Sequence, residues 1–410
     1  MVNIFSLGNR SMSKIDKPLA RLDETLPKGI DRRAFLGASV ATLIPAVAGC
    51  IGDDDDDDDD TAPDDGDDDD ADFIDITTSW RQPWRAEPTW SIEFLAERRG
   101  FWDGKGINPP SVQQGDGSPD TARRIGTGAN TMGTAEIAST VGGWAEGQES
   151  YVFGVNKQWN LLGLMWPEGW IDDHTDLEGN RVLLSSPFAE ATWPVIPDQL
   201  GLDDDAIETE FVEEEVTAGL LAEEDAEAVY GSLDTFGFID ATLDEDLQAY
   251  PLSEGIADVI GFPFLVSKDW YDETDRADEY LAAVLEGYSE AAHWAALNPD
   301  DTIDFVIDEV DPDLAVMERE ALEIQMKWAI NLKTGGAAEA NGVGYLDEDL
   351  VATSIDILAP VLADDEDDVP DPEDLIITEP FEMAELTTFS DDELDEVLDY
   401  IEFERSIFDL

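Results

Sequence analysis

Two Ser-Pro pairs in this sequence combine a capping serine with a proline suited to the first position of a helix. Ser118-Pro119 and Ser186-Pro187 each open an expected helix, and Ser185 precedes the second pair. A helix that begins in this way presents free backbone N–H groups and a partial positive charge. These groups attract a hydrogen-bond acceptor or an anion, although each serine could equally serve only as a cap. The pattern predicts noncovalent recognition by Ser118, Ser185 and Ser186.

Aromatic and polar residues near expected strand ends indicate how a small molecule could be bound. The rings of Trp80, Trp84, Trp166 and Tyr230 could stack on a planar ligand or bind a cation. Core packing is an equal alternative in a chain with 12 tryptophans. Glu136 could accept a hydrogen bond from a ligand amine. The other candidate ligand contacts are Arg81, Gln82, Thr131 and Thr134.

Catalytic motifs are absent from the sequence. It has no Gly-x-Ser-x-Gly, phosphate-binding loop, His-Glu-x-x-His or cysteine pair. Carboxylate pairs are so frequent that they say nothing about acid–base catalysis. His174 lies in a polar turn and His293 in an expected helix, where packing is the usual role. We therefore expect no enzymatic activity, no cofactor and no metal site.

The elements that would position these residues alternate between strands and helices in two blocks, which predicts an α/β fold with mostly parallel sheets. Residues 151–166 read as a strand pair. Other expected strands lie within residues 73–80, 109–114, 131–140, 181–186, 207–213, 226–232 and 256–270. Expected helices cover residues 90–101 and 216–224, begin at 118 and 187, and dominate after 276, ending in an amphipathic helix over 391–403.

The charge balance is extreme, with 98 Asp and Glu against 22 Lys and Arg and a net charge of −76. Such a surface repels itself unless salt screens it, which favours a high-salt habitat. It also excludes nucleic acid as a general partner. Because 42% of the residues are hydrophobic, we expect a folded protein rather than a disordered one. The single cysteine rules out an internal disulfide framework.

The N-terminal segment has the features of an export signal. Arg32 and Arg33 precede a charge-free apolar run over residues 34–48, and Val47-Ala48-Gly49 leads to Cys50. The arginine pair is typical of twin-arginine export, and the small residues before Cys50 resemble a lipobox. A buried internal helix is the alternative. We expect residues 1–49 to be a signal peptide, Cys50 to be lipidated, and the Asp-rich residues 50–72 to form an extended tether.

Several segments resemble a known family in their order and spacing. The first block contains Gly100-Phe101-Trp102, Gly117–Asp120 and Gly128–Glu136. The second begins with DLEGNRVLLSSP, and the late helices contain VSKDWYDE and YLAAVLEGYSEAAHWAALNPDD. Over residues 73–360 these segments are similar to solute-binding proteins of ABC importers. The branch concerned covers thiamine-precursor (hydroxymethylpyrimidine), sulfonate and nitrate binders, here in a lipoprotein form of the haloarchaeal type.

The resemblance implies a two-lobed periplasmic-binding-protein type II (Venus-flytrap) fold, with the ligand cleft between α/β lobes. The implied first lobe consists of residues 73–164 and 264–360, and the second of residues 165–263. An acidic extension would follow over 361–410. The lobes would close on a small polar or heterocyclic solute and deliver it to ABC permease subunits. The protein would be a monomer at the outer face of the cytoplasmic membrane, anchored through lipid on Cys50.

Two features depart from the family pattern. The acidic tail after Pro360 has no counterpart, and RQPWRAEP after Trp80 lacks the Asn-rich run associated with pyrimidine binders. The aromatic content slightly favours a planar heterocycle over a bare anion. An alternative from another class is a structural or adhesive surface lipoprotein without a small ligand.

Overall fold

The computed structural model describes residues 73–401, except 160–161, 173, 244–245, 252–258 and 363–368. Arg32, Arg33, Cys50 and the Asp-rich tether, for which the sequence predicts export and anchoring, lie outside these residues. Within the described ranges, none of the helices combines the length and the apolar composition that a membrane span requires.

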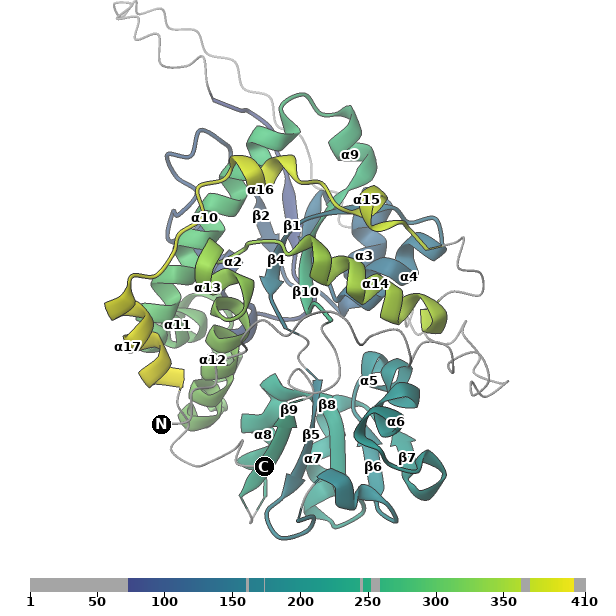
Figure 1. Cartoon of the computed structure of the whole chain (residues 1–410). Coiled ribbons are helices and arrows are strands. Elements are labelled where there is room, and N and C mark those ends of the chain that lie inside the picture. The colour runs from purple at the N-terminus through teal and green to yellow at the C-terminus, as the bar shows by residue number, and fades with distance from the viewer. Residues whose placement is uncertain are drawn as a thin grey trace, which may run out of the picture. The chain divides into compact units, whose positions relative to one another are not determined.

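A five-stranded sheet with the order β2-β1-β3-β10-β4 forms the centre of the first lobe, by which we mean residues 73–157 and 262–401 (Figure 1). β1 is parallel to β2 and β3, whereas β10 runs antiparallel to both β3 and β4. The strands are β1 (Ser79–Arg81), β2 (Ser111–Gln113), β3 (Met132–Thr134), β4 (Ser150–Lys157) and β10 (Phe262–Ser267).

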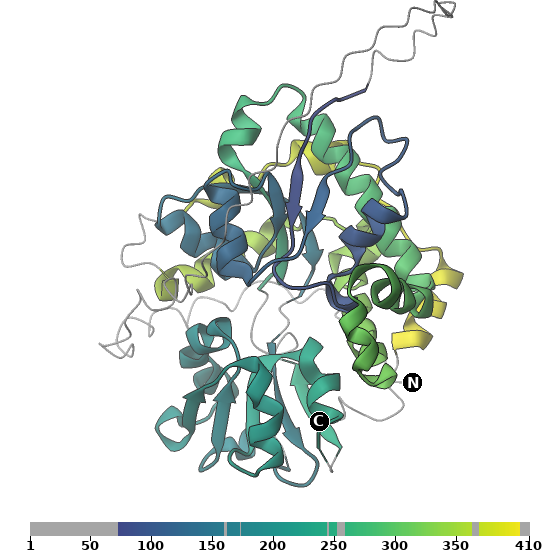
Figure 2. The ribbon, with the colours of Figure 1, turned by 180° about the vertical axis from the view of Figure 1, so that it is seen from behind.

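Side chains on the central strand alternate between two hydrophobic clusters, one on each face of this sheet. Phe264 and Val266 pack with residues of α2, α10 and α12, whereas Leu265 packs with residues of α3, α4 and α14. Figures 1 and 2 show helices on both faces. These helices are η3 (Pro88–Trp90), α2 (Ile92–Arg98), α3 (Ser118–Gly126), α4 (Ile137–Ala145), α9 (Lys268–Glu273), α10 (Ala277–Leu297), α11 (Pro299–Phe305), the π-helix η9 (Val306–Val310), η10 (Pro312–Val316), α12 (Arg319–Thr334), α13 (Ala337–Asn341) and α14 (Glu348–Leu362).

The second lobe, residues 162–251, has a sheet with the order β7-β6-β8-β5-β9. β6 is parallel to β7 and β8, and β5 runs antiparallel to β8 and β9. Its strands are β5 (Leu162–Pro167), β6 (Arg181–Leu184), β7 (Glu208–Phe211), β8 (Ala228–Ser232) and β9 (Leu247–Pro251). Its helices are η4 (His174–Leu177), α5 (Pro187–Thr192), η5 (Trp193–Val195), α6 (Ile196–Leu200), η6 (Asp204–Ala206), α7 (Glu214–Ala222), η7 (Leu233–Thr235) and α8 (Phe236–Asp240).

The chain passes between the two sheets twice, from β4 to β5 and from β9 to β10. Residues 151–166 were expected to form a strand pair, but β4 and β5 belong to different sheets. β4 pairs with β10 from Ser150 to Lys157, and β5 lies between β8 and β9. The expected division after residue 164 therefore falls inside β5, and the one after residue 263 falls inside β10.

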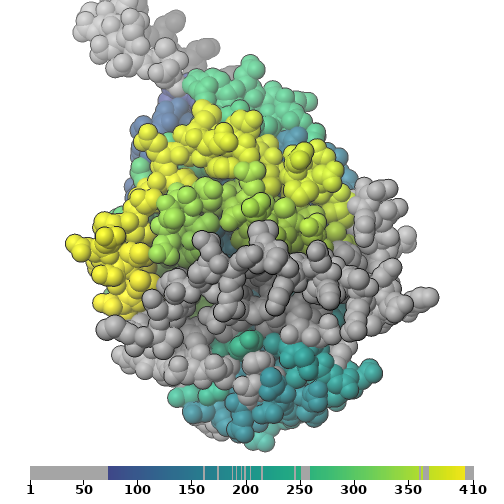
Figure 3. Space-filling view, viewed as in Figure 1, coloured from purple at the N-terminus to yellow at the C-terminus, as the bar shows by residue number. Residues whose placement is uncertain are grey.

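The C-terminal segments α15 (Pro372–Leu375), α16 (Glu379–Met383) and α17 (Asp391–Ile401) pack on the first lobe. Figure 3 shows them in yellow as a band over its visible face. Ile377 donates a backbone hydrogen bond to Val152 in β4, at 3.0 Å. Because β4 is an edge strand, this contact covers backbone groups that would otherwise remain open to pairing. Thr387 N also donates to Ser289 Oγ on α10, at 2.8 Å.

Two local expectations need correction, and one strand was not expected. Residues 73–80 were expected to form one strand, yet β1 begins at Ser79, and Ile74 makes only an isolated bridge to Ile107. The helix expected over 90–101 is instead a 3-10 turn followed by α2. β9 was not predicted, because LQAYP has no β-branched residue and ends in proline.

Candidate ligand-binding site

Strand ends from both lobes converge on one region between the two sheets. In the first sheet β1, β3 and β4 run in the same direction, and their C-terminal ends, at Arg81, Thr134 and Lys157, lie at the same end of the sheet. In the second sheet β8 ends at Ser232, and Asp234 follows in η7. An ion pair of 3.5 Å between Lys157 Nζ and Asp234 Oδ2 joins these ends of the two sheets. Ligands of open α/β sheets bind beyond such carboxyl ends, so this region is the candidate site.

Lys157 is the central charge of the site. Its side chain has no exposed surface, and its Nζ lies 3.5 Å from the centroid of the Trp90 ring and 4.7 Å from that of Phe262. Burial lowers the pKa of Lys157 to about 8, although Asp234, Glu136 and Glu93 oppose that shift. The ammonium is thus enclosed by aromatic rings and faced by carboxylates from both lobes.

A buried polar network lies beside Lys157. Asn156 donates to Glu93 Oε1 at 2.6 Å, and Lys333 from α12 donates to Asn156 Oδ1. Burial raises the pKa of Glu93 and lowers that of Lys333, and each group partly offsets the shift of the other. Asn156 therefore links an acid and a base from different helices and fixes the strand end next to Lys157.

Glu136 lies where β3 passes into α4 and retains some exposed surface. Its backbone N–H donates to Ser118 Oγ at 3.2 Å, which ties the start of α3 to the start of α4. Loss of hydration raises the pKa of Glu136 to about 7; Lys157 lowers it and Asp234 raises it further. This carboxyl therefore titrates near neutral pH.

Several buried polar side chains at these facing strand ends have polar atoms without a hydrogen-bond partner among the described residues, Glu93 Oε2 and Gln158 Oε1 included, and three of them matter most for a ligand. They are Gln82 just after β1, Lys157 at the end of β4 and Ser185 just after β6. The Gln82 amide approaches Glu93 closely enough to lower its pKa, without reaching hydrogen-bond geometry. Buried polar groups are rarely left unpaired in folded proteins. Their position at facing strand ends of the two sheets indicates a place where a ligand supplies the missing partners.

The structure places five predicted contacts at the edge where the sheets meet. Gln82, Thr134 and Glu136 follow or end strands of the first sheet, and Ser185 follows β6 of the second. Ser118 begins α3 and lies beside them, because it accepts the hydrogen bond from Glu136 N. Thr134 Oγ1 donates to Glu93 Oε1 at 3.4 Å. Ser186 serves as the N-cap of α5, because Ala189 N donates to its Oγ at 3.0 Å.

Three predicted aromatic contacts do not line this region. Trp80 is fully buried among Trp102, Phe153 and Phe264 in the core of the first lobe. Trp166 lies at the opposite end of its sheet, because β5 is antiparallel and Trp166 pairs with Gln248 at the start of β9. The buried Tyr230 hydroxyl shares a 2.8 Å hydrogen bond with Thr192, which satisfies it inside the second lobe.

The remaining three predicted contacts have other partners or positions. Thr131 precedes β3, at the end away from the site, and accepts a hydrogen bond from Ser79 N at 3.3 Å. Arg81 pairs with Asp116 and Asp120 at 2.7 and 3.1 Å, so its charge is already compensated. Trp84 is 44% exposed.

Sequence reasoning missed the residues at the centre of the site. These residues are Trp90, Glu93, Asn156, Lys157, Asp234 and Lys333. One feature of the sequence could have indicated them. Asn156-Lys157-Gln158 interrupts an otherwise apolar run, and lysine is rare in this chain.

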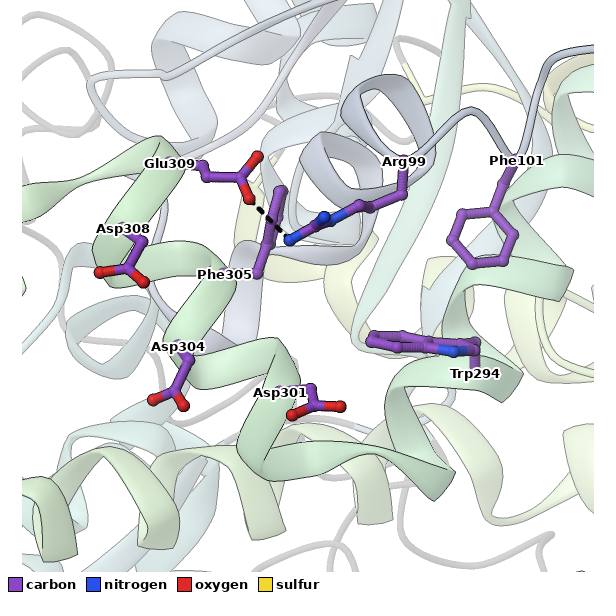
Figure 4. Close-up of a pocket in the computed structure, with 8 residues that line it drawn as sticks. All are labelled: Arg99, Phe101, Trp294, Asp301, Asp304, Phe305, Asp308 and Glu309. Carbon is purple, nitrogen blue, oxygen red and sulfur yellow. Dashed lines mark hydrogen bonds and ion pairs between the residues drawn. The ribbon is translucent and has the colours of Figure 1, made fainter.

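A separate pocket of about 460 Å³ lies in the first lobe, between the end of α2 and the segment α10–η9 (Figure 4). Phe101 and Trp294 form one wall, while Asp301, Asp304 and Asp308 line the other side. The only cation there, Arg99, pairs with Glu309 at 2.6 Å. Acidic clusters are expected anywhere on so acidic a surface, and we assign this pocket no ligand. Among the described residues no group of three or more His, Cys, Asp or Glu side chains could hold a metal ion.

Comparisons with known proteins show the fold. No protein-family model and no curated protein matches the sequence. The aliphatic sulphonate binding protein of Escherichia coli is similar with a TM-score of 0.57 at 13% identity, over 77% of this chain and 94% of its own. The alkanesulfonate-binding protein of Xanthomonas axonopodis pv. citri, bound to MOPS, gives 0.53 at 12%, over 74% and 99%. A zinc-bound ligand-binding component of an ABC-type import system from Staphylococcus aureus gives 0.54 at 8%, over 77% and 100%.

These likenesses and the two strand orders confirm the expected fold class. The chain has the two-lobed α/β fold of periplasmic binding proteins of type II, with two crossings between the lobes.

Proposed function

We propose that this protein is the exported, lipid-anchored solute-binding component of an ABC importer and that it has no enzymatic activity. The observation that carries the proposal is the set of unpaired polar atoms on Gln82, Lys157 and Ser185 at facing strand ends. The periplasmic-binding-protein fold and the solute-binding names of its structural neighbours support it. The solute would be small and polar or heterocyclic, of the thiamine-precursor, sulfonate or nitrate class.

Hinge closure is the mechanism that this arrangement favours. In the part of the chain that the structure describes, the two sheets are linked along the chain only between β4 and β5 and between β9 and β10, so rotation about these links changes the separation of Lys157 and Asp234. A ligand that contacts both strand edges binds the closed state better than the open one and shifts the equilibrium toward it. The permease would then recognise the closed protein.

A ligand screen in molar potassium chloride tests this function. At a hundred-fold excess over its Kd, a true ligand should stabilise the protein by about 2.7 kcal/mol and raise the melting temperature by several degrees. The panel contains hydroxymethylpyrimidine, ethanesulfonate, MOPS and nitrate at constant ionic strength. If none raises the melting temperature, the binding function is rejected and a structural or adhesive lipoprotein becomes the better account.

Replacing Cys50 with serine tests the predicted anchor. Without a thiol to accept lipid, we expect the protein to appear in the medium and to bind ligand as before. Fractionation of cells and medium by immunoblot measures this. A matched variant, Arg32→Lys with Arg33→Lys, should instead accumulate inside the cell, because it disables export rather than anchoring. Membrane retention of Cys50→Ser would show that another element attaches the protein.

A further inference from the structure

The ammonium of Lys157 is buried but incompletely paired. Its side chain has no exposed surface, and Nζ has no hydrogen-bond partner among the described residues. The Asp234 oxygen at 3.5 Å provides an ion pair without hydrogen-bond geometry. An ammonium has three N–H donors, and leaving them all unsatisfied in a dry site is costly. Apart from this Asp234 oxygen, the described residues offer no hydrogen-bond acceptor to Nζ.

Aromatic rings define where that acceptor can lie. Trp90 and Phe262 form an edge-to-face pair with centroids 4.7 Å apart, and the ammonium sits against both rings. Rings attract a cation but accept no strong hydrogen bond. Donors that do not face the rings are turned toward the carboxylates around Nζ, of which Asp234 lies in the second lobe. An acceptor placed in the space between the lobes, on the side of Asp234, can reach them.

Asp234 is the single group of the second lobe that forms an ion pair with Lys157 among the described residues. Its carboxylate is buried in η7, and no other hydrogen bond or ion pair to that carboxylate is found in the described part of the chain. Asp234 thus has the charge and position that an acidic group on a ligand would need. Both carboxylates could not occupy the same side of one ammonium without strong repulsion.

On the basis of the function proposed above, we propose that Lys157 binds an acidic group of the ligand and that Asp234 is an internal competitor for the same ammonium. The ligand class is then a small organic or inorganic anion. Binding exchanges one ion pair, between Lys157 and Asp234, for another, between Lys157 and the ligand. The ligand replaces a long contact with a charge-assisted hydrogen bond, which is the stronger interaction.

The surrounding titratable groups make this exchange sensitive to pH in one direction. The groups facing Lys157 are Glu93 from α2, Glu136 at the start of α4, Asp234 from η7 and Lys333 from α12. The pKa of Glu136 is about 7 and that of Lys157 about 8. As pH rises from 6 to 9, Glu136 gains negative charge and Lys157 loses positive charge. Affinity for an anion should therefore fall by at least 10-fold over this range, whereas affinity for a cation would rise.

Calorimetric titration of the full chain with ethanesulfonate, nitrate and uncharged hydroxymethylpyrimidine tests the proposal, in molar potassium chloride at pH 6, 7 and 9. Lys157→Gln should weaken binding of the anions by about 30- to 100-fold. Lys157→Arg should restore most of that loss, and Asp234→Asn should tighten anion binding by about 10-fold. Lys268→Gln and Asp269→Asn, which change the same charges on the exposed helix α9, are the matched controls.

The outcomes separate this inference from the function on which it rests. If only hydroxymethylpyrimidine binds, or if anions bind equally to Lys157→Gln, the binding function stands and the role of Lys157 is rejected. Weaker anion binding in Asp234→Asn would overturn the competition. If no probe binds, both proposals fail. Unfolding of each variant without ligand is followed by circular dichroism, and Lys157→Arg keeps the test decisive if Lys157→Gln does not fold.

Discussion

Trp80→Ala should lower the free energy of unfolding by about 3–5 kcal/mol, as expected when a large buried ring is removed from a packed core. Trp80 has no exposed surface, and its ring lies 5.0 Å from that of Phe264 and 6.2 Å from that of Phe153, centroid to centroid. These partners come from β10 and β4, so the indole connects three strands of one sheet. Urea unfolding at fixed molar salt measures the loss.

Trp84→Ala is the matched control for this prediction. Trp84 is four residues away in the same segment but 44% exposed, so its removal should change stability by no more than about 0.5 kcal/mol. Both residues were candidates for ligand stacking on sequence grounds. If Trp80→Ala leaves stability unchanged and removes ligand affinity instead, its assignment to the core is wrong.

The order of elements was predictable because local patterns determine it. Ser-Pro pairs start α3 and α5 where proline suits the first helical turn, and VLL in β6 and the apolar FPFLV of β10 read as buried strands. The resemblance then implied how the two blocks combine. The strand orders, with β10 in the first sheet and β5 in the second, are consistent with that implication.

Which residues line the site was less predictable, because the direction of a strand in its sheet and the face on which its side chains lie depend on the tertiary structure. Trp166 lies next to the end of β5, but β5 runs antiparallel to its neighbours, so that end points away from the other lobe. Trp80 was expected at a strand end, but it is the middle residue of β1 and points into the core. Lys333 is separated from its partner Asn156 by 177 residues along the chain, so no spacing rule could connect them.

Lysines are few in this acidic chain, and the positions of two of them bear on the proposed site. Five lysines fall within residues 73–401, and two of them, Lys157 and Lys333, are almost completely buried near the same tryptophan. Carboxylates on the surface cannot supply positive charge to an interior site. Enclosing lysines with aromatic rings shields them from the acidic exterior. A site for an anion can therefore exist inside a chain whose net charge is −76.

Glu93→Leu should have the other large effect on stability, a loss of about 3–5 kcal/mol near neutral pH. Glu93 is completely buried and is the main group that favours the charged form of Lys333, with Asn156 between them. Removing the acid deprives the buried ammonium of its main anion and leaves only the weaker influence of Asp234. Glu93→Gln, which keeps a polar side chain next to Asn156, should lose less.

The double variant Glu93→Leu with Lys333→Met shows whether the stability loss of Glu93→Leu comes from the unpaired charge of Lys333 or from altered packing around the new side chain. Because it leaves no unpaired charge, it should be more stable than the sum of the two single variants predicts, by about 2 kcal/mol. Equality with that sum would mean that the two residues stabilise the fold independently.

The pH dependence of Glu93→Leu provides an independent check on the same charge. Burial already lowers the pKa of Lys333 in the folded protein, and loss of Glu93 lowers it further. Between that folded pKa and the unfolded value of about 10.4, the unfolded chain binds the extra proton, so stability rises with pH. The deficit of Glu93→Leu relative to the wild type should therefore be largest at pH 6 and shrink toward pH 9. Urea unfolding across this range measures the change.

A deficit that does not vary with pH would mean that Lys333 is already neutral in the folded protein. Glu93 would then stabilise the fold only through its hydrogen bonds with Asn156 and Thr134.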